Sequence, residues 1–249
     1  MVEGLYQRCT DLRALWGAMG DRRCTVRSVS SRRRITGRRD SGPAEGEGVI
    51  VLVSGATRFQ RDAKVGHLIV PRAWAHPQTL DLTQPWAMDN GAFSGFDEGA
   101  YLRMLERFAG IPGCLFVTAP DVVADAASTL ARWPFWSQLL RGLGHRPAFV
   151  AQDGLTPERV PWDDLGALFI GGSTIYKESA DARALCAYAN AKGIWVHWGR
   201  VNGKRRYEMA LKAGVDSIDG TGFSMYPDTN IPLVAEWHAA IEQQLELGL

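Results

Sequence analysis

Short apolar segments alternate with longer amphipathic segments from residue 48 almost to the end of the chain. The apolar segments occupy consecutive positions, as expected for parallel strands that are covered on both faces. The predicted strands are Val49–Val53, His67–Val70, Trp86–Met88, Cys114–Thr118, Ala148–Ala151, Ala167–Ile170, Ile194–His197 and Ser217–Ile218. The segments between them repeat apolar residues at helical spacing. The predicted helices are Asp97–Phe108, Ala124–Leu143, Pro157–Leu165, Ala180–Ala191, Gly203–Ala213 and Ile231–Leu247.

This alternation favours an α/β fold, a (β/α)₈ TIM barrel, over a doubly wound sheet. The length of 249 residues is usual for one such barrel. Residues 54–85 contain several prolines and no clear helical period. The first two units are therefore expected to be irregular, and a shorter or irregular barrel stays open as an alternative.

The first 47 residues differ in composition from the rest of the chain. Residues 1–40 contain ten arginines and four acidic residues, whereas the whole chain has a net charge of +1. The segment 41–48, S-G-P-A-E-G-E-G, is typical of a linker. We predict an Arg-rich disordered extension and linker at 1–47 and one domain at 48–249. The extension either binds nucleic-acid phosphates or precedes the true start of the protein.

Composition excludes several classes of protein. No apolar stretch approaches the roughly 20 residues of a membrane span, and no apolar region follows the early arginines as in a signal peptide. The four cysteines are Cys9, Cys24, Cys114 and Cys186, which lie far apart and predict neither a zinc site nor a disulfide framework. We expect a cytoplasmic protein.

Chemically active residues follow five of the predicted strands. They are Asp89, Asp121, Gln152, the pair Gly171–Gly172, and Asp219. In a TIM barrel the C-terminal strand ends form one ring, where catalytic residues lie. The sequence therefore predicts that these residues share one site.

Each carboxylate also has a simpler interpretation. Asp219 could attack a sugar carbon or stabilise an oxocarbenium ion, or it could cap its own turn before Gly220. Asp89 could be the second carboxylate of an acid/base pair, or part of an Asn-Gly turn. Asp121 could accept hydrogen bonds from a heterocycle, whereas Asp125 fits better as a helix cap.

The remaining candidates suit a flat, polar ring. The Gln152 amide can donate and accept, and backbone N–H groups at Gly171–Gly172 could bind a carbonyl oxygen or a phosphate. Together with Asp121 they complement guanine, which has donors at N1 and the 2-amino group and an acceptor at O6. Phe93 and Trp198 could stack on the ring, or belong to the core.

Two further groups of residues stay ambiguous. His197 is either a ligand-binding residue or a hydrogen-bonded residue inside the barrel. The basic cluster after the seventh strand either contacts nucleic-acid phosphates or forms a solvated helix start. Its members are Arg200, Lys204, Arg205 and Arg206.

The ordered set resembles the tRNA-guanine (queuine) transglycosylase superfamily, especially its short phage and bacterial branch of 7-deazaguanine DNA transglycosylase-like proteins. M-D-N-G-A-F resembles the family's D-S-G-G-F/Y-Q segment, and F-V-A-Q-D-G resembles I-V-Q-G-G. T-A-P-D-V-V and F-I-G-G-S are similar to the segments that bind the base, and V-D-S-I-D-G-T looks like V-D-M-F-D-C. The resemblance covers roughly residues 49–232.

The resemblance implies a role for each matched residue. Asp219 is the nucleophile and Asp89 the acid/base group. Asp121, Gln152 and the glycine pair hold the base, while Phe93 and Trp198 cover its faces. The implied reaction replaces guanine in a polynucleotide with a 7-deazaguanine such as preQ0, with no metal or cofactor.

The chain also departs from the family. It has no cysteine after Cys186 and so lacks the C-x-C-x-x-C…H zinc site that helps to hold tRNA, which favours DNA over tRNA. S-T-I-Y-K-E replaces the L-A-V-G-E segment that contacts the 7-substituent, so the incoming base stays open. A barrel enzyme for a small phosphorylated metabolite and a non-catalytic nucleic-acid-binding protein are the alternative functions.

Overall fold

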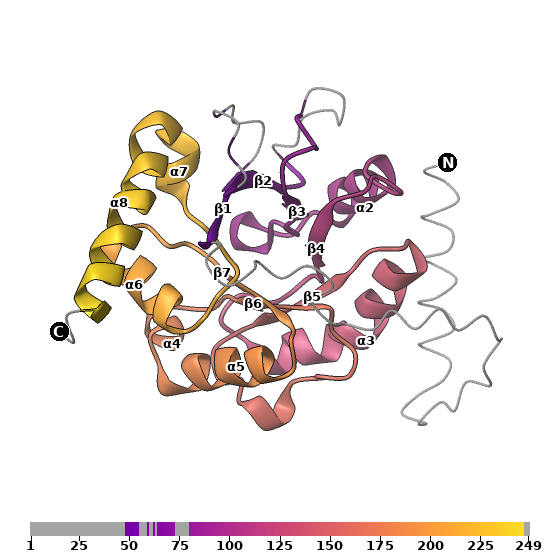
Figure 1. The fold of residues 1–249 in the computed structure, drawn as a ribbon. Coiled ribbons are helices and arrows are strands. Elements are labelled where there is room, and N and C mark those ends of the chain that lie inside the picture. Colours follow the sequence, from indigo (N-terminus) through magenta and orange to yellow (C-terminus); the bar gives the residue numbers. More distant parts are fainter. Residues whose placement is uncertain (1–47, 55–58, 60–61, 63, 73–79, 247–249) are drawn as a thin grey trace, which may run out of the picture.

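The chain forms a closed barrel of parallel strands in sequence order, β1 to β8, surrounded by helices (Figure 1). The computed structural model describes residues 48–54, 59, 62, 64–72 and 80–246. The strands are β1 (Ile50–Ser54), β2 (Val65–Ile69), β3 (Trp86–Met88), β4 (Cys114–Thr118), β5 (Pro147–Ala151), β6 (Ala167–Ile170), β7 (Trp195–Trp198) and β8 (Ser217–Asp219). Parallel pairing of β1 with β8, including Leu52 with Asp219, closes the ring. The TIM-barrel prediction is confirmed.

The helices also follow the predicted order. They are α2 (Glu98–Arg107), α3 (Ala126–Gly142), α4 (Thr174–Lys177), α5 (Ala180–Ala191), α6 (Lys204–Lys212), α7 (Thr221–Met225) and α8 (Pro227–Glu246), with 3₁₀ turns η2 (Ala92–Ser94) and η3 (Pro157–Arg159). Asp97 and Asp125 cap α2 and α3, each accepting a hydrogen bond from a backbone N–H three residues later, at 2.9 Å. Asp125 is thus a helix cap, as expected. None of the helices formed by described residues is long and apolar enough to cross a bilayer.

The helix predicted over Pro157–Leu165 is wrong. Only the 3₁₀ turn η3 forms there, and Val160 has an extended backbone with ψ 135°. Val160 precedes Pro161, whose ring disfavours helical geometry in the preceding residue. The two short helices α4 and α7 were not predicted, because each is only about one turn long. Between β1 and β3, the described residues other than β2 form no helix or strand. The predicted extension at 1–47 lies outside the described residues.

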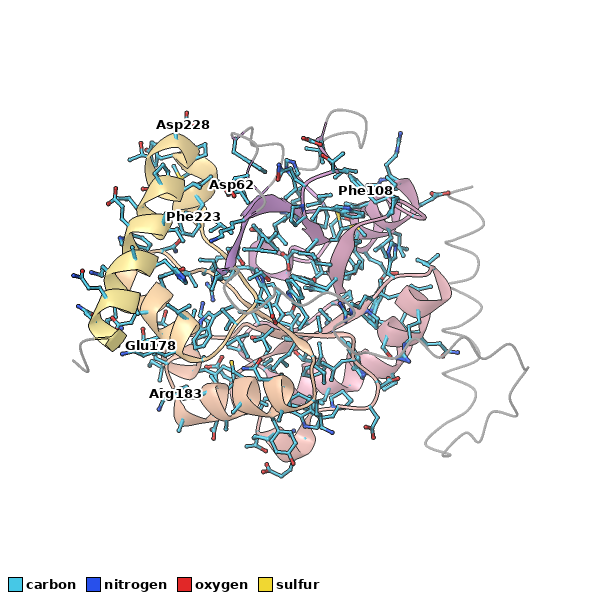
Figure 2. The ribbon with its side chains drawn as sticks, in the orientation of Figure 1. Asp62, Phe108, Glu178, Arg183, Phe223 and Asp228 are labelled. Carbon is cyan, nitrogen blue, oxygen red and sulfur yellow. The ribbon has the colours of Figure 1, made fainter. Side chains whose placement is uncertain are left out.

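Alternate residues of each strand point into the barrel or towards the helices. Side chains fill both the interior and the surrounding layer (Figure 2). The interior cluster consists of Leu52, Leu68, Ala87, Phe116, Ala148, Val150, Ala167, Phe169 and Trp195. Continuing this alternation to the strand ends directs Asp89, Gln152, Gly171 and Asp219 inwards. The apolar interior therefore forms the floor beneath a polar mouth.

Candidate active site

The C-terminal ends of the strands surround a pocket of about 310 Å³. Its walls include eight of the residues proposed from the sequence: Asp89, Phe93, Asp121, Gln152, Gly171, Gly172, Arg200 and Asp219. These residues follow six different strands or their loops, from β3 to β8. Residues up to 130 positions apart in the chain thus contribute to one site, as the TIM-barrel rule predicts.

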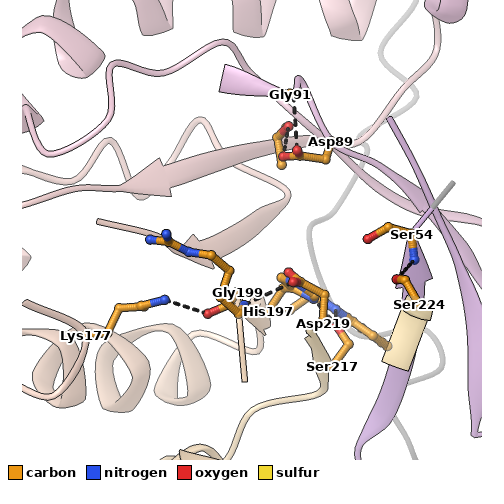
Figure 3. A network of polar contacts seen from close by, with 12 residues as sticks. Ser54, Asp89, Gly91, Lys177, His197, Gly199, Ser217, Asp219 and Ser224 are labelled. Carbon is orange, nitrogen blue, oxygen red and sulfur yellow. Dashed lines mark hydrogen bonds and ion pairs between the residues drawn. The ribbon is translucent and has the colours of Figure 1, made fainter. Parts of the chain in front are cut away.

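Asp219, the last residue of β8, is a buried carboxylate with both oxygens held. Oδ2 lies 3.0 Å from Nε2 of His197, and Oδ1 accepts the backbone N–H of Arg200 at 3.0 Å. The other ring nitrogen of His197 lies 2.9 Å from Ser217 Oγ. His197 is therefore a hydrogen-bonded residue inside the barrel, and it orients the Asp219 side chain (Figure 3).

Access to Asp219 depends on Gly199 at the end of β7. A Cβ atom there would lie 2.7 Å from Cε1 of Phe169 and 3.4 Å from Oδ2 of Asp219. Any side chain at this position would displace the pocket floor and crowd the carboxylate. The absence of a side chain thus leaves space for a ligand next to Asp219.

Asp89 faces the same pocket from the end of β3 (Figure 3). Its Oδ2 accepts the N–H of Gly91 at 3.1 Å, and its Oδ1 accepts the Thr118 hydroxyl at 3.3 Å. Gly91 has φ 75°, so the Asn-Gly turn also exists, and it places the carboxylate. Burial raises the pKa of Asp89, and the negative charge of Asp219 raises it further.

Asp121 is held by two amides on neighbouring loops. Asn90 donates to Oδ1 at 2.8 Å, and Gln152 donates to Oδ2 at 2.6 Å. Burial raises the pKa of Asp121 to about 6, although the hydrogen bond from Asn90 opposes that shift. Gln152 Oε1 accepts the N–H of Ala124 at 2.8 Å, so this amide also positions the carboxylate. Asp121 is thus an oriented acceptor on the pocket wall.

Asn90 was not identified as a site residue from the sequence. Its amide nitrogen also lies 3.0 Å from Thr118 Oγ1 and 2.9 Å from the carbonyl of Ala119, and its Oδ1 accepts the N–H of Ala92 at 2.7 Å. The residue is 1% exposed. An asparagine before a glycine indicates a turn. That pattern gives no sign of the second role of Asn90, which links the loops after β3 and β4.

The two glycines of the predicted pair have different roles. The N–H of Gly171 is bonded to the carbonyl of Ala151 at 3.0 Å, so the prediction that it is available to a ligand is wrong. The N–H of Gly172 makes no hydrogen bond to any residue that the structure describes. Gly172 has φ 77°, and a Cβ there would lie 2.6 Å from Asp153 Oδ2. Of this pair, the N–H of Gly172 is therefore the one that could serve a ligand as a donor.

Phe93 and Arg200 form the exposed edge of the pocket. The Arg200 guanidinium lies 4.1 Å from the centroid of the Phe93 ring, which is 68% exposed. Arg200 Nη2 also donates to the carbonyl of Gly172 at 2.7 Å. Arg200 has φ 61°, and Ala124 shares this value; these two are the non-glycine residues of positive φ in the described chain. Both therefore place unusual backbone conformations beside the site.

Trp198 does not belong to the pocket. It is 2% exposed and packs in the outer core between strands and helices. Trp195 and His197 of β7 point inwards, so Trp198, one residue after His197, points outwards. The prediction that Trp198 covers a bound ring is therefore wrong.

Lys204 and Arg205 lie on the surface at the start of α6, outside the pocket wall. Arg205 makes two hydrogen bonds of 2.8 Å to Glu178. Contact with phosphates stays a prediction for both residues.

Lys177 in α4 is a wall residue that was not among the predicted site residues, although it lies in the S-T-I-Y-K-E segment. It is 2% exposed, and its Nζ donates to the carbonyl of Gly199 at 2.8 Å (Figure 3). In the sequence, a lysine followed by glutamate resembles an ordinary solvated pair.

Among the described residues, no group of three or more His, Cys, Asp or Glu side chains is arranged to hold a metal ion.

No protein-family model matches the chain, and no curated protein matches it at a significant level. Solved structures do resemble it. The Bacillus subtilis YkuI protein with an EAL domain, solved with substrate c-di-GMP and calcium, aligns at 11% identity and TM-score 0.45, over 68% of this chain and 46% of that one. RipC from Yersinia pestis aligns at 13% identity and TM-score 0.42, over 69% of this chain and 88% of that one. The chain spans less than half of the YkuI structure.

Proposed function

We propose that this protein is a base-exchange transglycosylase that replaces guanine in a polynucleotide with a 7-deazaguanine. The main support is the convergence of Asp89, Asp121, Gln152, Gly172 and Asp219 on one pocket. A volume of about 310 Å³ lies at the lower end of the usual range for small-molecule sites, roughly 300–1,000 Å³. That size suits a single bicyclic base.

The order of the strands around the pocket supports a particular pose. Around guanine, the glycosidic N9 is followed by C8, N7, O6, N1, the 2-amino group and N3. Around the barrel, Asp219 on β8 is followed by the β7 loop, Gly172 after β6, Gln152 after β5, Asp121 after β4 and Asp89 after β3. With C1′ at Asp219, the N–H of Gly172 meets O6 and Asp121 accepts N1–H and the 2-amino group. Asp89 then lies on the N3 side, near the glycosidic bond.

The chemistry follows from this pose in two half-reactions. An oxygen of Asp219 attacks C1′, the C1′–N9 bond breaks, and its electron pair leaves with guanine, which takes a proton from Asp89. The incoming base then gives its N9 proton to Asp89 and attacks C1′, which releases Asp219. Asp89 suits the acid role because burial and the charge of Asp219 favour its protonated form.

The surface around the pocket suits a polynucleotide. Phe93 and Val123 are exposed apolar side chains on the pocket wall, and Ile175, Met225 and Tyr226 are exposed in the segments that follow β6 and β8. Arg72 and Arg200 lie on the pocket wall, with Lys204 and Arg205 at the start of α6. Bases stack on exposed rings and phosphates bind such cations. A target base inside a duplex would have to be flipped out of its stack.

Exchange of labelled guanine into polymer tests the proposal. The purified full-length protein is incubated with labelled guanine and either duplex DNA, single-stranded DNA or unmodified tRNA. We expect label in DNA, with no other substrate or cofactor added. Label in tRNA alone would replace DNA by tRNA as the substrate. Absence of label from every polymer would contradict the transglycosylase.

A further inference from the structure

The mechanism above leaves one buried cation without a role. The side chain of Lys177 is 2% exposed and lies on the pocket wall. Its one direct partner among the described residues is the carbonyl oxygen of Gly199, at 2.8 Å. An ammonium group has three donors and needs charge compensation when it is taken out of water. Two of its donors therefore remain for another acceptor.

No carboxylate of the described chain forms an ion pair with Lys177. Asp219 and Asp153 are near enough to influence it, and Arg200 opposes them. Burial lowers the pKa of Lys177 to about 8, assisted by the positive charge of Arg200, so the amine is still largely protonated at pH 7. A bound anion would compensate this charge, whereas a bound cation would increase the repulsion.

The position of Lys177 corresponds to one edge of the base. Its Nζ touches Gly199, which follows β7, and β7 lies between β6 and β8 in the ring. In the proposed pose, β6 supplies the donor for O6 and β8 the carboxylate at C1′. The edge of the base between those two points carries C8 and position 7. A substituent at C7 therefore points towards the Lys177 ammonium.

We infer that Lys177 selects an incoming 7-deazaguanine that carries an anionic group, a carboxylate, at C7. This inference rests on the proposed function, because the pose defines which edge Lys177 meets. A carboxylate at C7 would accept the two remaining N–H donors of Lys177 and neutralise its charge. A 7-aminomethyl group, which is positively charged at pH 7, would be disfavoured at the same place. Guanine has no substituent there, so its departure does not require this contact.

Binding of three free bases tests the inference. Isothermal titration with the full-length protein compares 7-deazaguanine with its 7-carboxy and 7-aminomethyl derivatives. A hydrogen bond to a charged group typically changes affinity by about tenfold or more, so we expect the carboxy base to bind at least about tenfold more tightly than the aminomethyl base. Equal affinity, or tighter binding of the aminomethyl base, would overturn the inference without any variant.

The Lys177→Met variant identifies the residue responsible. Methionine has a similar length and no charge, and removing a buried charge of this kind need not destabilise the fold. We expect the preference for the carboxy base to fall to within about threefold. Lys212→Met is the matched control, since Lys212 on α6 binds Glu208 at 2.8 Å outside the pocket wall. An unchanged preference in a folded Lys177→Met protein would overturn the inference.

The exchange assay separates this inference from the proposed function. If wild-type protein exchanges guanine but does not prefer the carboxy base, the transglycosylase stands and the inference fails. If Lys177 determines a carboxylate preference in binding but no polymer takes up guanine, the anion-binding role stands and the transglycosylase fails.

Discussion

The two sides of the pocket surround their carboxylates with different partners. On the β3–β5 side, the Asp89 and Asp121 carboxylates accept hydrogen bonds from a backbone N–H, a hydroxyl and two amides. On the β6–β8 side, Asp219 lies beside His197, and the cations Lys177 and Arg200 line the same wall. Neutral partners thus predominate on one side and basic groups on the other.

This difference gives similar side chains different chemistry. Burial among neutral partners raises the pKa of both Asp89 and Asp121 and favours the protonated acid. On the other side, His197 and the backbone N–H of Arg200 hold both oxygens of Asp219 beside the space that Gly199 leaves open, a position suited to attack on carbon. The contrast therefore supports an acid at Asp89 and a nucleophile at Asp219.

Removing the proposed nucleophile should have the largest effect. Asp219→Asn should lower the exchange rate by roughly 10⁴-fold or more, because no covalent intermediate can form. Labelled-guanine exchange gives the rate, and a denaturing gel of protein with labelled polymer detects the adduct. Asp125→Asn makes the same change in a helix cap outside the pocket wall and should retain both signals. Exchange by Asp219→Asn would remove this residue from the nucleophile role.

Loss of the proposed acid, Asp89, should lower the exchange rate by less than loss of the nucleophile Asp219. Asp89→Asn keeps the shape of the side chain and removes proton transfer, so exchange should slow by about 10²–10⁴-fold. The same exchange assay measures this effect across pH. Near-normal exchange by the variant would show that the β3 side supplies no proton.

The pH dependence of the exchange rate tests whether the amide partners of Asp121 stabilise its ionised form. This carboxylate must be ionised to accept two hydrogen bonds, so exchange should fall as pH falls through about 6. The hydrogen bond from Asn90 stabilises the ionised form. Asn90→Ala should therefore raise the pKa of Asp121 and move the acidic limb of kcat/KM to higher pH, by about one pH unit.

A matched amide outside the site provides the control for this profile. Asn190 on α5 donates to the carbonyl of Ala213 at 3.0 Å, and Asn190→Ala should leave the acidic limb in place. If the acidic limb of the kcat/KM profile of Asn90→Ala stays at the wild-type pH, Asp121 does not control that limb.

The smallest expected effect concerns the backbone beside the site. Ala124 has φ 61°, which costs a residue with a Cβ about 1–2 kcal/mol relative to glycine. Ala124→Gly should raise Tm by about 2–4 °C for each kcal/mol recovered. Ala131→Gly in the exposed face of α3 should instead cost about 1 kcal/mol. A lower Tm for Ala124→Gly in thermal unfolding would refute strain at this position.

Much of the architecture could be predicted because strand and helix signals are local. The predicted strands at Trp86–Met88, Cys114–Thr118 and Ala167–Ile170 agree with the observed residues. At Pro157–Leu165 the sequence itself contains the reason that no helix forms, since Pro161 makes a helix through Val160 unfavourable. The same is true of Trp198, because strand alternation from the inward His197 directs it outwards.

The partners of the site residues were beyond sequence reasoning. Asn90 belongs to an Asn-Gly pair that indicates only a turn, yet its side chain bonds the β3 loop to Asp121, 31 positions further along the chain. Lys177 looks like a solvated lysine until α4 places it against Gly199, 22 positions away. Such contacts depend on how separate loops pack, and no local pattern encodes that packing.

The order of strands and helices can be read from local patterns, and it implies that acidic and amide residues at strand ends meet at one end of a barrel. This is possible because hydrophobic periodicity is a property of neighbouring residues, and because parallel strands end on the same side. Local patterns do not show which of these groups touch, which N–H groups are used within the fold, or which charges are buried together; these depend on the packing of the complete barrel. Hydrogen bonding and desolvation depend on atoms from distant segments, and their positions exist only after the ring has closed.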